Sequence, residues 1–139
     1  MMFVSKNLRV FIVDDEPDVC WVLKILLQKH DYQVDIEESG KRALARLKKS
    51  GHLYQLVLLD AKLSDIEGVD LARLIRSETA CKAPILLVSG YFYQDDSMVQ
   101  DSMRNGLISG FVTKPFRHED LLQAIETVLE HSRNDTSSL

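Results

Sequence analysis

Three short runs of consecutive apolar residues constrain the fold more than any other feature of this sequence. They cover residues 10–13, 56–59 and 85–88, and none contains a polar residue. A strand with one face in water alternates apolar with polar residues, whereas a strand covered on both faces can be apolar throughout. The runs therefore predict the central strands of a parallel sheet with helices on each face.

Segments with helical periodicity separate the strands. In the first helical segment, apolar residues recur at the spacing of one buried helix face: Val19, Val22, Leu23, Leu26 and Leu27. His30 and Asp31 are expected to close this helix. A second, basic helix is expected to open at Ser39 and Gly40 and to stop at Gly51, a residue type that often ends helices.

The rest of the chain repeats this pattern. Residues 32–36 form a weaker expected strand and residues 110–113 a short last one, and further apolar helix faces follow residues 68, 97 and 118. Five strand–helix pairs predict one α/β domain built on a doubly wound parallel sheet. Residues 132–139 are polar and are expected to form a frayed C-terminal tail.

Composition limits the classes of function. The chain has 139 residues, 45% of them hydrophobic, and no apolar run approaches the length of a membrane span. A net charge of −4 argues against direct binding to nucleic acid, which favours a basic face. The apolar stretch at the N-terminus is too short for a secretory signal peptide. Cys20 and Cys81 show no metal-binding spacing and are expected to be reduced, so we predict a cytoplasmic protein.

Polar side chains stand where four of the five expected strands end. They are Asp14 and Asp15 after the first strand, Asp60 after the third, Ser89 after the fourth and Lys114 after the fifth. Parallel sheets bind ligands outside the carboxyl ends of their strands, so these side chains are candidates for one site. Taken singly, each has an ordinary explanation such as a helix cap, a turn or a surface lysine. Their joint placement favours a functional site.

The chemistry of this set points to phosphate. Two carboxylates about 4 Å apart repel by roughly 4 kcal/mol at an effective dielectric near 20, so a cation, a raised pKa or the Lys114 ammonium must offset the repulsion. Oxygen donors without His or Cys suit Mg²⁺ or Mn²⁺, and Mg²⁺ commonly completes its shell with phosphate oxygen. We expect Asp14 and Asp15 to hold the metal and Asp60 to be the nucleophile. Lys114 and Ser89 would neutralise the phosphoryl oxygens.

The sequence resembles the receiver domains of two-component response regulators. The likeness covers roughly residues 7–131 and rests on motifs in the family's order: residues 10–17, 56–60, 87–90 and 110–116. It implies a flavodoxin-like fold with strand order 2-1-3-4-5, a cis Lys114–Pro115 bond and Mg²⁺ bound by Asp14, Asp15, Asp60 and the backbone carbonyl of Lys62. The implied donor is a phosphohistidine on a sensor kinase or phosphotransfer domain. Such a protein acts on itself and is not an enzyme with turnover.

The same resemblance implies a switch and a partner face. Ser89 and Phe111 would move when Asp60 is phosphorylated, unless Phe111 is permanently buried. Lys62 and Tyr91 would flank the phosphoryl group, unless they are plain loop residues. The fourth helix, fifth strand and fifth helix form the family's usual face for dimers or effectors. Ser64 stands where the family usually has proline, which predicts a more mobile loop.

Other functions fit less well. An aspartate-nucleophile phosphatase usually has a second Asp two residues after the nucleophile, where this chain has Lys62, and 139 residues leave no cap domain. A nucleotide- or flavin-binding domain needs a Gly- or Ser/Thr-rich loop after the first strand. A degenerate receiver that serves as a binding scaffold would not need the complete set of site residues. The sequence leaves the output, the kinase and the oligomeric state open.

Overall fold

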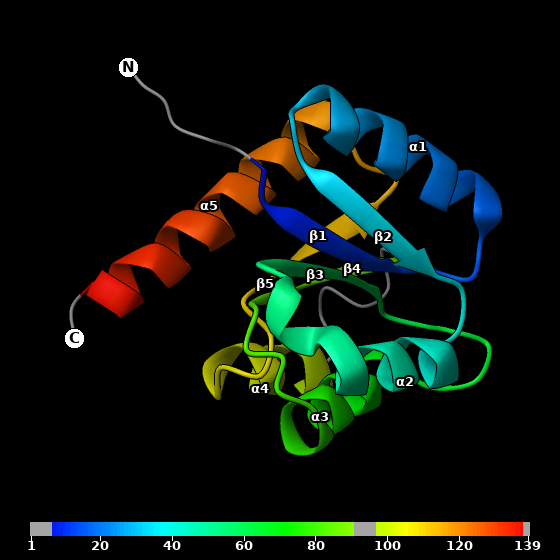
Figure 1. Ribbon diagram of the computed structural model, residues 1–139, viewed down its shortest axis with the longest axis vertical. Coiled ribbons are helices and arrows are strands. Elements are labelled where there is room, and N and C mark those ends of the chain that lie inside the picture. The colour runs from blue at the N-terminus through cyan, green and yellow to red at the C-terminus, as the bar shows by residue number, and fades with distance from the viewer. Residues whose placement is uncertain (1–6, 91–96, 138–139) are drawn as a thin grey trace.

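The structure is a computed structural model that describes residues 7–90 and 97–137, with side chains as far as residue 133. Five parallel strands form one sheet in the order β2-β1-β3-β4-β5, which confirms the predicted fold class (Figure 1). The strands are β1 (Arg9–Val13), β2 (Gln33–Glu37), β3 (Leu56–Asp60), β4 (Ile85–Gly90) and β5 (Gly110–Lys114). The helices are α1 (Pro17–Lys29), α2 (Gly40–Ser50), the short 3₁₀ helix η1 (Gly51–Leu53), α3 (Gly68–Glu78), α4 (Ser97–Arg104) and α5 (His118–Ser137).

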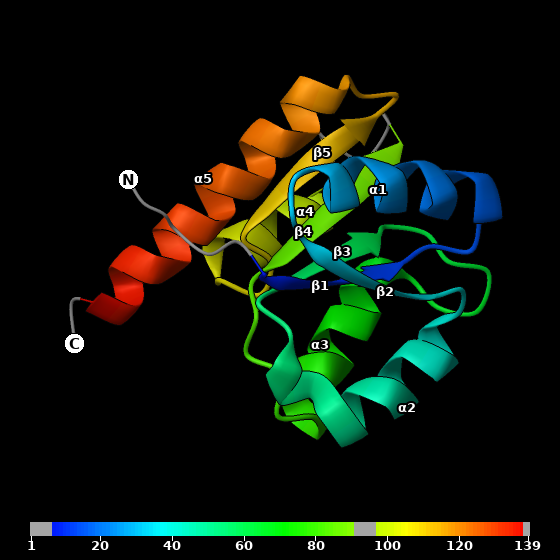
Figure 2. The same cartoon turned by 45° about the horizontal axis from the view of Figure 1, so that its top comes forward.

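The sheet carries a hydrophobic core on each face. Successive residues of a strand point to opposite faces, so Phe11 and Val13 join one core while Val10 and Ile12 join the other. Helices α2, α3 and α4 cover the first face, and α1 and α5 cover the second (Figures 1 and 2). The central strand β3 is buried along its whole length, as its unbroken apolar run predicted.

Helix α1 departs from its predicted buried face at one position. Leu23, Leu26 and Leu27 are buried as expected, but the side chain of Val22 is 45% exposed, so that prediction was wrong. Cys20 is buried in the same core and places the centre of the buried face away from Val22. The helix ends at its predicted place because Asp31, with a positive φ of 69°, turns the chain toward β2.

Helix α2 begins and ends where predicted, but Gly51 is there for close packing and not for the conformation that usually ends a helix. The Ser39 side chain accepts a hydrogen bond from the Arg42 N–H at 3.1 Å and caps the first turn. Gly51 is not in a left-handed conformation, since its φ is −59°. A Cβ at Gly51 would lie 2.9 Å from the Cβ of Cys81, so close packing explains the glycine.

The expected polar tail is largely helical. We predicted a frayed segment over 132–139, but α5 continues to Ser137, so the prediction is wrong for residues 132–137. The prediction relied on the apolar face of the helix, which stops at Leu129. A helix can continue beyond its apolar face, because backbone hydrogen bonds also form between polar residues. In residues 7–90 and 97–137, no helix is long and apolar enough to cross a membrane.

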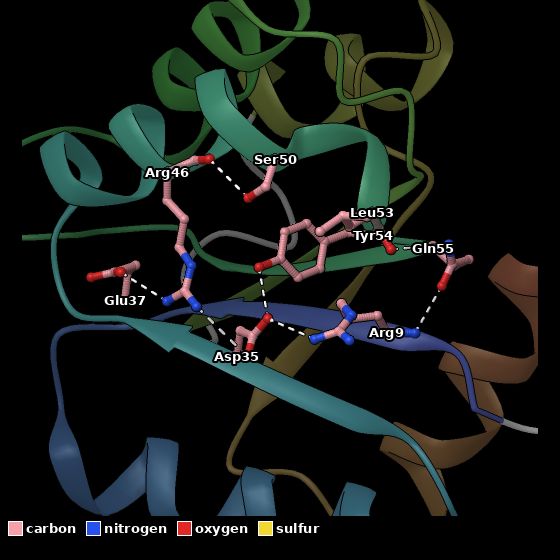
Figure 3. Close-up of polar contacts among 8 residues, drawn as sticks. All are labelled: Arg9, Asp35, Glu37, Arg46, Ser50, Leu53, Tyr54 and Gln55. Carbon is pink, nitrogen blue, oxygen red and sulfur yellow. Dashed lines mark hydrogen bonds and ion pairs between the residues drawn. The ribbon is translucent and has the colours of Figure 1, made fainter.

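A network of charged side chains joins β2 to β1 and α2 (Figure 3). Asp35 accepts from the Tyr54 hydroxyl at 2.7 Å and pairs with Arg9 at 3.4 Å. Arg46 pairs with Asp35 at 3.7 Å and with Glu37 at 2.9 Å. Two guanidinium groups therefore meet two carboxylates. This network, which we call the β2 network, fastens the edge strand to the helix above it.

Candidate functional site

Three carboxylates meet at the carboxyl ends of β1 and β3. These strands are paired with Val13 opposite Leu59, which places Asp14 beside Asp60. One carboxylate oxygen from each of Asp14, Asp15 and Asp60 lies within 4.8 Å of the other two. Asp14 is 2% exposed and Asp60 is 8% exposed, so water screens these charges weakly.

The Lys114 ammonium at the end of β5 lies among these carboxylates. Its Nζ is 3.3 Å from Asp14 Oδ2 and 3.8 Å from Asp60 Oδ2. It also lies 3.4 Å from Glu16 Oε1, a contact that sequence reasoning missed although Glu16 directly follows the acidic pair. Lys114 therefore contacts three carboxylates, and Asp15 adds a fourth carboxylate to the group, which leaves the site with an excess of negative charge.

The excess negative charge changes how these groups titrate. Burial, together with the neighbouring Asp14 carboxylate, raises the pKa of Asp60 from its ordinary value of 3.8 to about 6. Burial also raises the pKa of Asp14. Although burial lowers the pKa of the Lys114 ammonium, the carboxylates of Asp14 and Asp60 raise it by more, so Lys114 stays charged. Additional positive charge would stabilise the ionised forms of Asp14 and Asp60.

Ser89 lies one strand away from Asp60, with its side chain fully buried. Strands β3 and β4 pair Asp60 with Val88, so Ser89 follows directly at the same edge. Among the residues that the structure describes, the Ser89 hydroxyl has no hydrogen-bond partner. A buried hydroxyl without a partner costs roughly 1–3 kcal/mol, so this group favours a ligand that supplies an acceptor.

The loop from Ala61 to Glu67 is held to the site by hydrogen bonds. The backbone N–H of Lys62 donates to Asp60 Oδ1 at 3.2 Å, and that of Ser64 donates to Asp15 Oδ2 at 2.8 Å. Asp65 accepts two backbone N–H bonds from the start of α2, at 3.0 and 2.9 Å, which lower the pKa of its carboxyl. A proline in place of Ser64 could not donate to Asp15. The loop thus orients two of the three site carboxylates.

A sequence model of the response regulator receiver domain matches residues 10–126. The chain belongs to this family. Its relatives include the uncharacterized transcriptional regulatory protein YkoG of Bacillus subtilis, which is 31% identical over 134 residues, covering 94% of this chain and 55% of the relative. The chain thus spans about half the length of the curated relatives that it matches.

Solved structures of receiver domains share the fold. The CheY-like receiver domain protein of Methanospirillum hungatei has a TM-score of 0.81 and 25% identity, over 94% of this chain and 99% of that one. The response regulator TrrA of Thermotoga maritima, solved in complex with Mg²⁺-BeF, has a TM-score of 0.72 and 30% identity, over 87% and 98%. The chain is therefore a receiver domain of two-component signalling in both sequence and architecture.

The remaining predicted site residues of this receiver domain have different outcomes. The Lys114–Pro115 bond is cis, as predicted. Phe111 is half-buried against the core on the α2 and α3 side, and whether it switches stays a prediction. Tyr91 lies outside the described residues. Lys62 is exposed, and metal binding by its carbonyl also stays a prediction.

The receiver domain's acidic cluster fits a hard divalent cation. All three candidate ligands offer carboxylate oxygen, with no imidazole or thiolate in the cluster. Cys20 is the cysteine nearest to the acidic cluster along the chain. Burial raises the pKa of its thiol to about 12, and its Sγ donates to the Asp14 carbonyl oxygen at 3.2 Å, so it is not available as a thiolate ligand. Cys20 and Cys81 are both free and buried, in agreement with the prediction that they are reduced.

Proposed function

We propose that this receiver domain accepts a phosphoryl group on Asp60 from a phosphorylated histidine of a sensor kinase or phosphotransfer domain. The observation that carries the proposal is the buried Asp60 carboxylate between Asp14 and Lys114, at the edge of the sheet where ligands of parallel sheets bind. The domain acts on itself, forming and losing its own aspartyl-phosphate, and is not an enzyme with an external substrate.

In the proposed reaction, a carboxylate oxygen of Asp60 attacks phosphorus. The new P–O bond forms as the P–N bond to the donor histidine breaks, and the electron pair of that bond stays on the imidazole. The Lys62 N–H holds Asp60 Oδ1 at 3.2 Å, which leaves Oδ2 as the oxygen facing Lys114. Lys114 then stabilises charge on the transferring phosphoryl oxygens.

Asp14, Asp15 and Asp60 would hold Mg²⁺ or Mn²⁺, together with the backbone carbonyl of Lys62. The cation would supply positive charge for the phosphoryl oxygens. The Mg²⁺-BeF complex of TrrA from Thermotoga maritima supports this assignment. Ser64 supports it as well, because its N–H fixes the orientation of the Asp15 carboxylate.

Ser89 supplies the proposed link from chemistry to signal. Its buried hydroxyl would donate to the phosphoryl group on Asp60, and Phe111 would turn inward as Ser89 moves. This change would remodel the face formed by α4, β5 and α5, where we propose that an effector or a second copy binds. Equal partner binding or self-association with and without beryllofluoride would contradict this part of the proposal.

Lys62 and Tyr91 are proposed to flank the phosphoryl group and to set its lifetime. Lys62 lies two residues after the acceptor and is exposed, which leaves its side chain able to reach over the site. The decay rate of the aspartyl-phosphate in Lys62→Ala and Tyr91→Ala tests this. Lifetimes equal to that of the unchanged protein would remove both residues from the proposal.

Exposed apolar residues on α1 suit docking of the phosphodonor. Trp21, Val22 and Ile25 are 64%, 45% and 42% exposed, and their helix starts directly after the acidic residues of the site. A donor histidine aligned with Asp60 would bring its own protein over this surface. Trp21→Ser should therefore slow transfer from a histidine donor without slowing transfer from acetyl phosphate. Leu53→Ser is a matched control, because Leu53 is also 45% exposed but precedes β3 at the far end of the sheet.

The output of the domain is proposed to lie outside it. The relatives YkoG and TrcR are named transcriptional regulatory proteins, and this chain spans about half of each. We infer that any contact with nucleic acid belongs to another segment or partner, since this domain carries a net charge of −4. The cytoplasmic location that we predicted remains part of the proposal.

The experiment that tests the acceptor chemistry is intact mass measurement after incubation with Mg²⁺ and acetyl phosphate. The mass should increase by one phosphoryl group. The increase should vanish without Mg²⁺ and in Asp60→Asn. Several small phosphodonors that all fail to add mass, or an increase that persists in Asp60→Asn, would overturn the proposal.

A further inference from the structure

A cavity of about 620 Å³ lies at the amino ends of β4 and β5. Small-molecule pockets in proteins typically measure about 300–1,000 Å³, so this cavity is large enough for a ligand. Its walls come from the end of α3, the segments that enter β4 and β5, helix α4 and the second half of α5.

The cavity is separate from the phosphoacceptor site. Asp60 and Lys114 stand at the carboxyl ends of their strands, whereas the cavity residues Pro84 and Ser109 immediately precede β4 and β5. The full length of β5 therefore lies between the two. Asp60 chemistry does not account for the cavity or for the residues that line it.

The lining combines an apolar wall with basic side chains. Met103, Ile108 and Val128 supply the apolar part. Arg76, Lys82 and His131 supply the basic part. Of the described residues that line the cavity, none carries a carboxylate. In a chain with a net charge of −4, the charges of Arg76 and Lys82 are a local concentration of positive charge, and they complement an anion.

Arg76 is the key member of this set because its charge is half-buried. Its NH1 donates to the Cys81 carbonyl at 3.1 Å and its NH2 to the Ala83 carbonyl at 2.7 Å. A guanidinium group has five N–H donors, so these two bonds fix its position without using all of them. Across residues 7–90 and 97–133, no carboxylate forms an ion pair with it. In keeping with this, burial lowers the pKa of Arg76.

We propose that this cavity binds a small organic anion. The apolar body of the ligand lies against Met103, Ile108 and Val128, and its phosphate or carboxylate group pairs with Arg76 and Lys82. Arginine favours such groups because its planar donors match their oxygens. The ligand class is therefore an amphipathic phosphate monoester or carboxylate.

The test titrates 1-naphthyl phosphate, 1-naphthylacetate and uncharged 1-naphthol into the full chain and follows the backbone amides by NMR. The Asp60→Asn variant without Mg²⁺ is used, so that binding at the phosphoacceptor site does not contribute. Both anions should shift the amides of Gly106, Ile108 and Ser109, and naphthol should bind more weakly. The anion that binds more tightly identifies the head group. The proposal is overturned if neither anion shifts these amides, or if naphthol binds as tightly as the anions.

Variants separate anion pairing from general apolar binding. Lys82→Ala should weaken binding of the preferred anion about threefold to fivefold, as expected for an exposed charge pair. Arg76→Gln should weaken it by roughly tenfold or more, because the half-buried guanidinium is the stronger partner. Lys82→Glu places a negative charge at an exposed position and provides a second test if Arg76→Gln fails to fold. The control is Lys49→Ala, an exposed lysine on α2 outside the cavity. Equal affinity in Lys82→Glu and Lys49→Ala contradicts the proposal.

Discussion

Two clusters of carboxylates around basic side chains stand out in the described part of the chain, and they differ in their balance of charge. In the β2 network, Asp35 and Glu37 meet Arg9 and Arg46, so the formal charges cancel (Figure 3). In the phosphoacceptor cluster, the carboxylates of Asp14, Asp15, Asp60 and Glu16 gather near the single ammonium of Lys114. Both clusters lie beside β1, one above its surface and the other at its end.

The difference separates a structural role from a chemical one. A balanced network satisfies its own charges and contributes to stability. An unbalanced, buried cluster is destabilised in isolation and is stabilised by whatever brings positive charge or hydrogen-bond donors. The raised pKa of Asp60, caused first by burial and then by Asp14, is the expected sign of such a cluster. Removing a carboxylate from the phosphoacceptor cluster should therefore raise stability and impair phosphorylation, whereas substitutions in the β2 network should lower stability and leave phosphorylation unchanged.

The largest effect is expected from Lys114→Met. Removing the ammonium takes away a preorganised charge that faces the transferring phosphoryl group, so the rate of phosphorylation by acetyl phosphate should fall roughly 10²- to 10³-fold. The rate is followed by intact mass over time. Lys49→Met is the control, since it removes an exposed lysine on α2. A rate within a few-fold of the unchanged protein would show that Lys114 has no role in the transfer.

Asp60→Asn should stabilise the metal-free protein at pH 7. The folded-state pKa of Asp60 is raised from 3.8 to about 6, so the wild-type protein loses stability as the pH rises through this window, whereas the variant does not. At pH 7 the free energy of unfolding should exceed that of wild type by about 1–3 kcal/mol, and near pH 4 the difference should shrink toward zero.

Urea denaturation with EDTA at both pH values measures this. Asp35→Asn is the matched control from the β2 network and should destabilise the protein at pH 7, because it removes a partner of Arg9 and Arg46. The comparison between the clusters fails if Asp60→Asn lowers stability at pH 7 or if its effect is independent of pH.

Tyr54→Phe should cost about 1–2 kcal/mol of unfolding free energy without altering phosphorylation. The substitution removes the hydroxyl that donates to Asp35 at 2.7 Å and leaves the buried ring in place. Burial and this hydrogen bond raise the pKa of Tyr54 to about 12, so the hydroxyl remains a donor at neutral pH. Thermal or urea unfolding gives the loss, and intact mass checks the chemistry. A slower phosphorylation would mean that the β2 network is coupled to the site.

The smallest effect is expected at Ser64. Ser64→Pro removes the N–H that donates to Asp15 at 2.8 Å, and we expect Mg²⁺ affinity to fall about threefold. This loss is smaller than the tenfold or more that is typical when a side chain that hydrogen-bonds a metal ligand is removed. Ser64→Ala retains the N–H and should bind Mg²⁺ normally. Equal affinities in the two variants would show that this hydrogen bond does not orient Asp15.

The sequence predicted the sheet and the centre of the site because both follow from local patterns. Unbroken apolar runs mark strands covered on both faces, and polar residues directly after such strands share one edge. That reasoning brought together Asp14, Asp15, Asp60, Ser89 and Lys114, and the structure places all five at the carboxyl edge of the sheet.

Other features depend on contacts that no local pattern records. Glu16 reaches Lys114 across the sheet, and Gly51 is required by the approach of Cys81. Val22 was misplaced because helical spacing does not fix which edge of an apolar stripe meets the core. The cavity beside Arg76 could not be predicted either, since its walls come from several separate segments of the chain.

The central claim is that the unbalanced cluster, and not the balanced one, binds the divalent cation. Isothermal titration of Mg²⁺ into the wild type, Asp14→Asn and Asp35→Asn tests it most directly. We predict that Asp14→Asn weakens Mg²⁺ binding by more than the roughly tenfold that loss of an outer-shell partner costs, while Asp35→Asn binds Mg²⁺ like the wild type. Unchanged affinity in Asp14→Asn, or an equal loss in Asp35→Asn, would contradict the account.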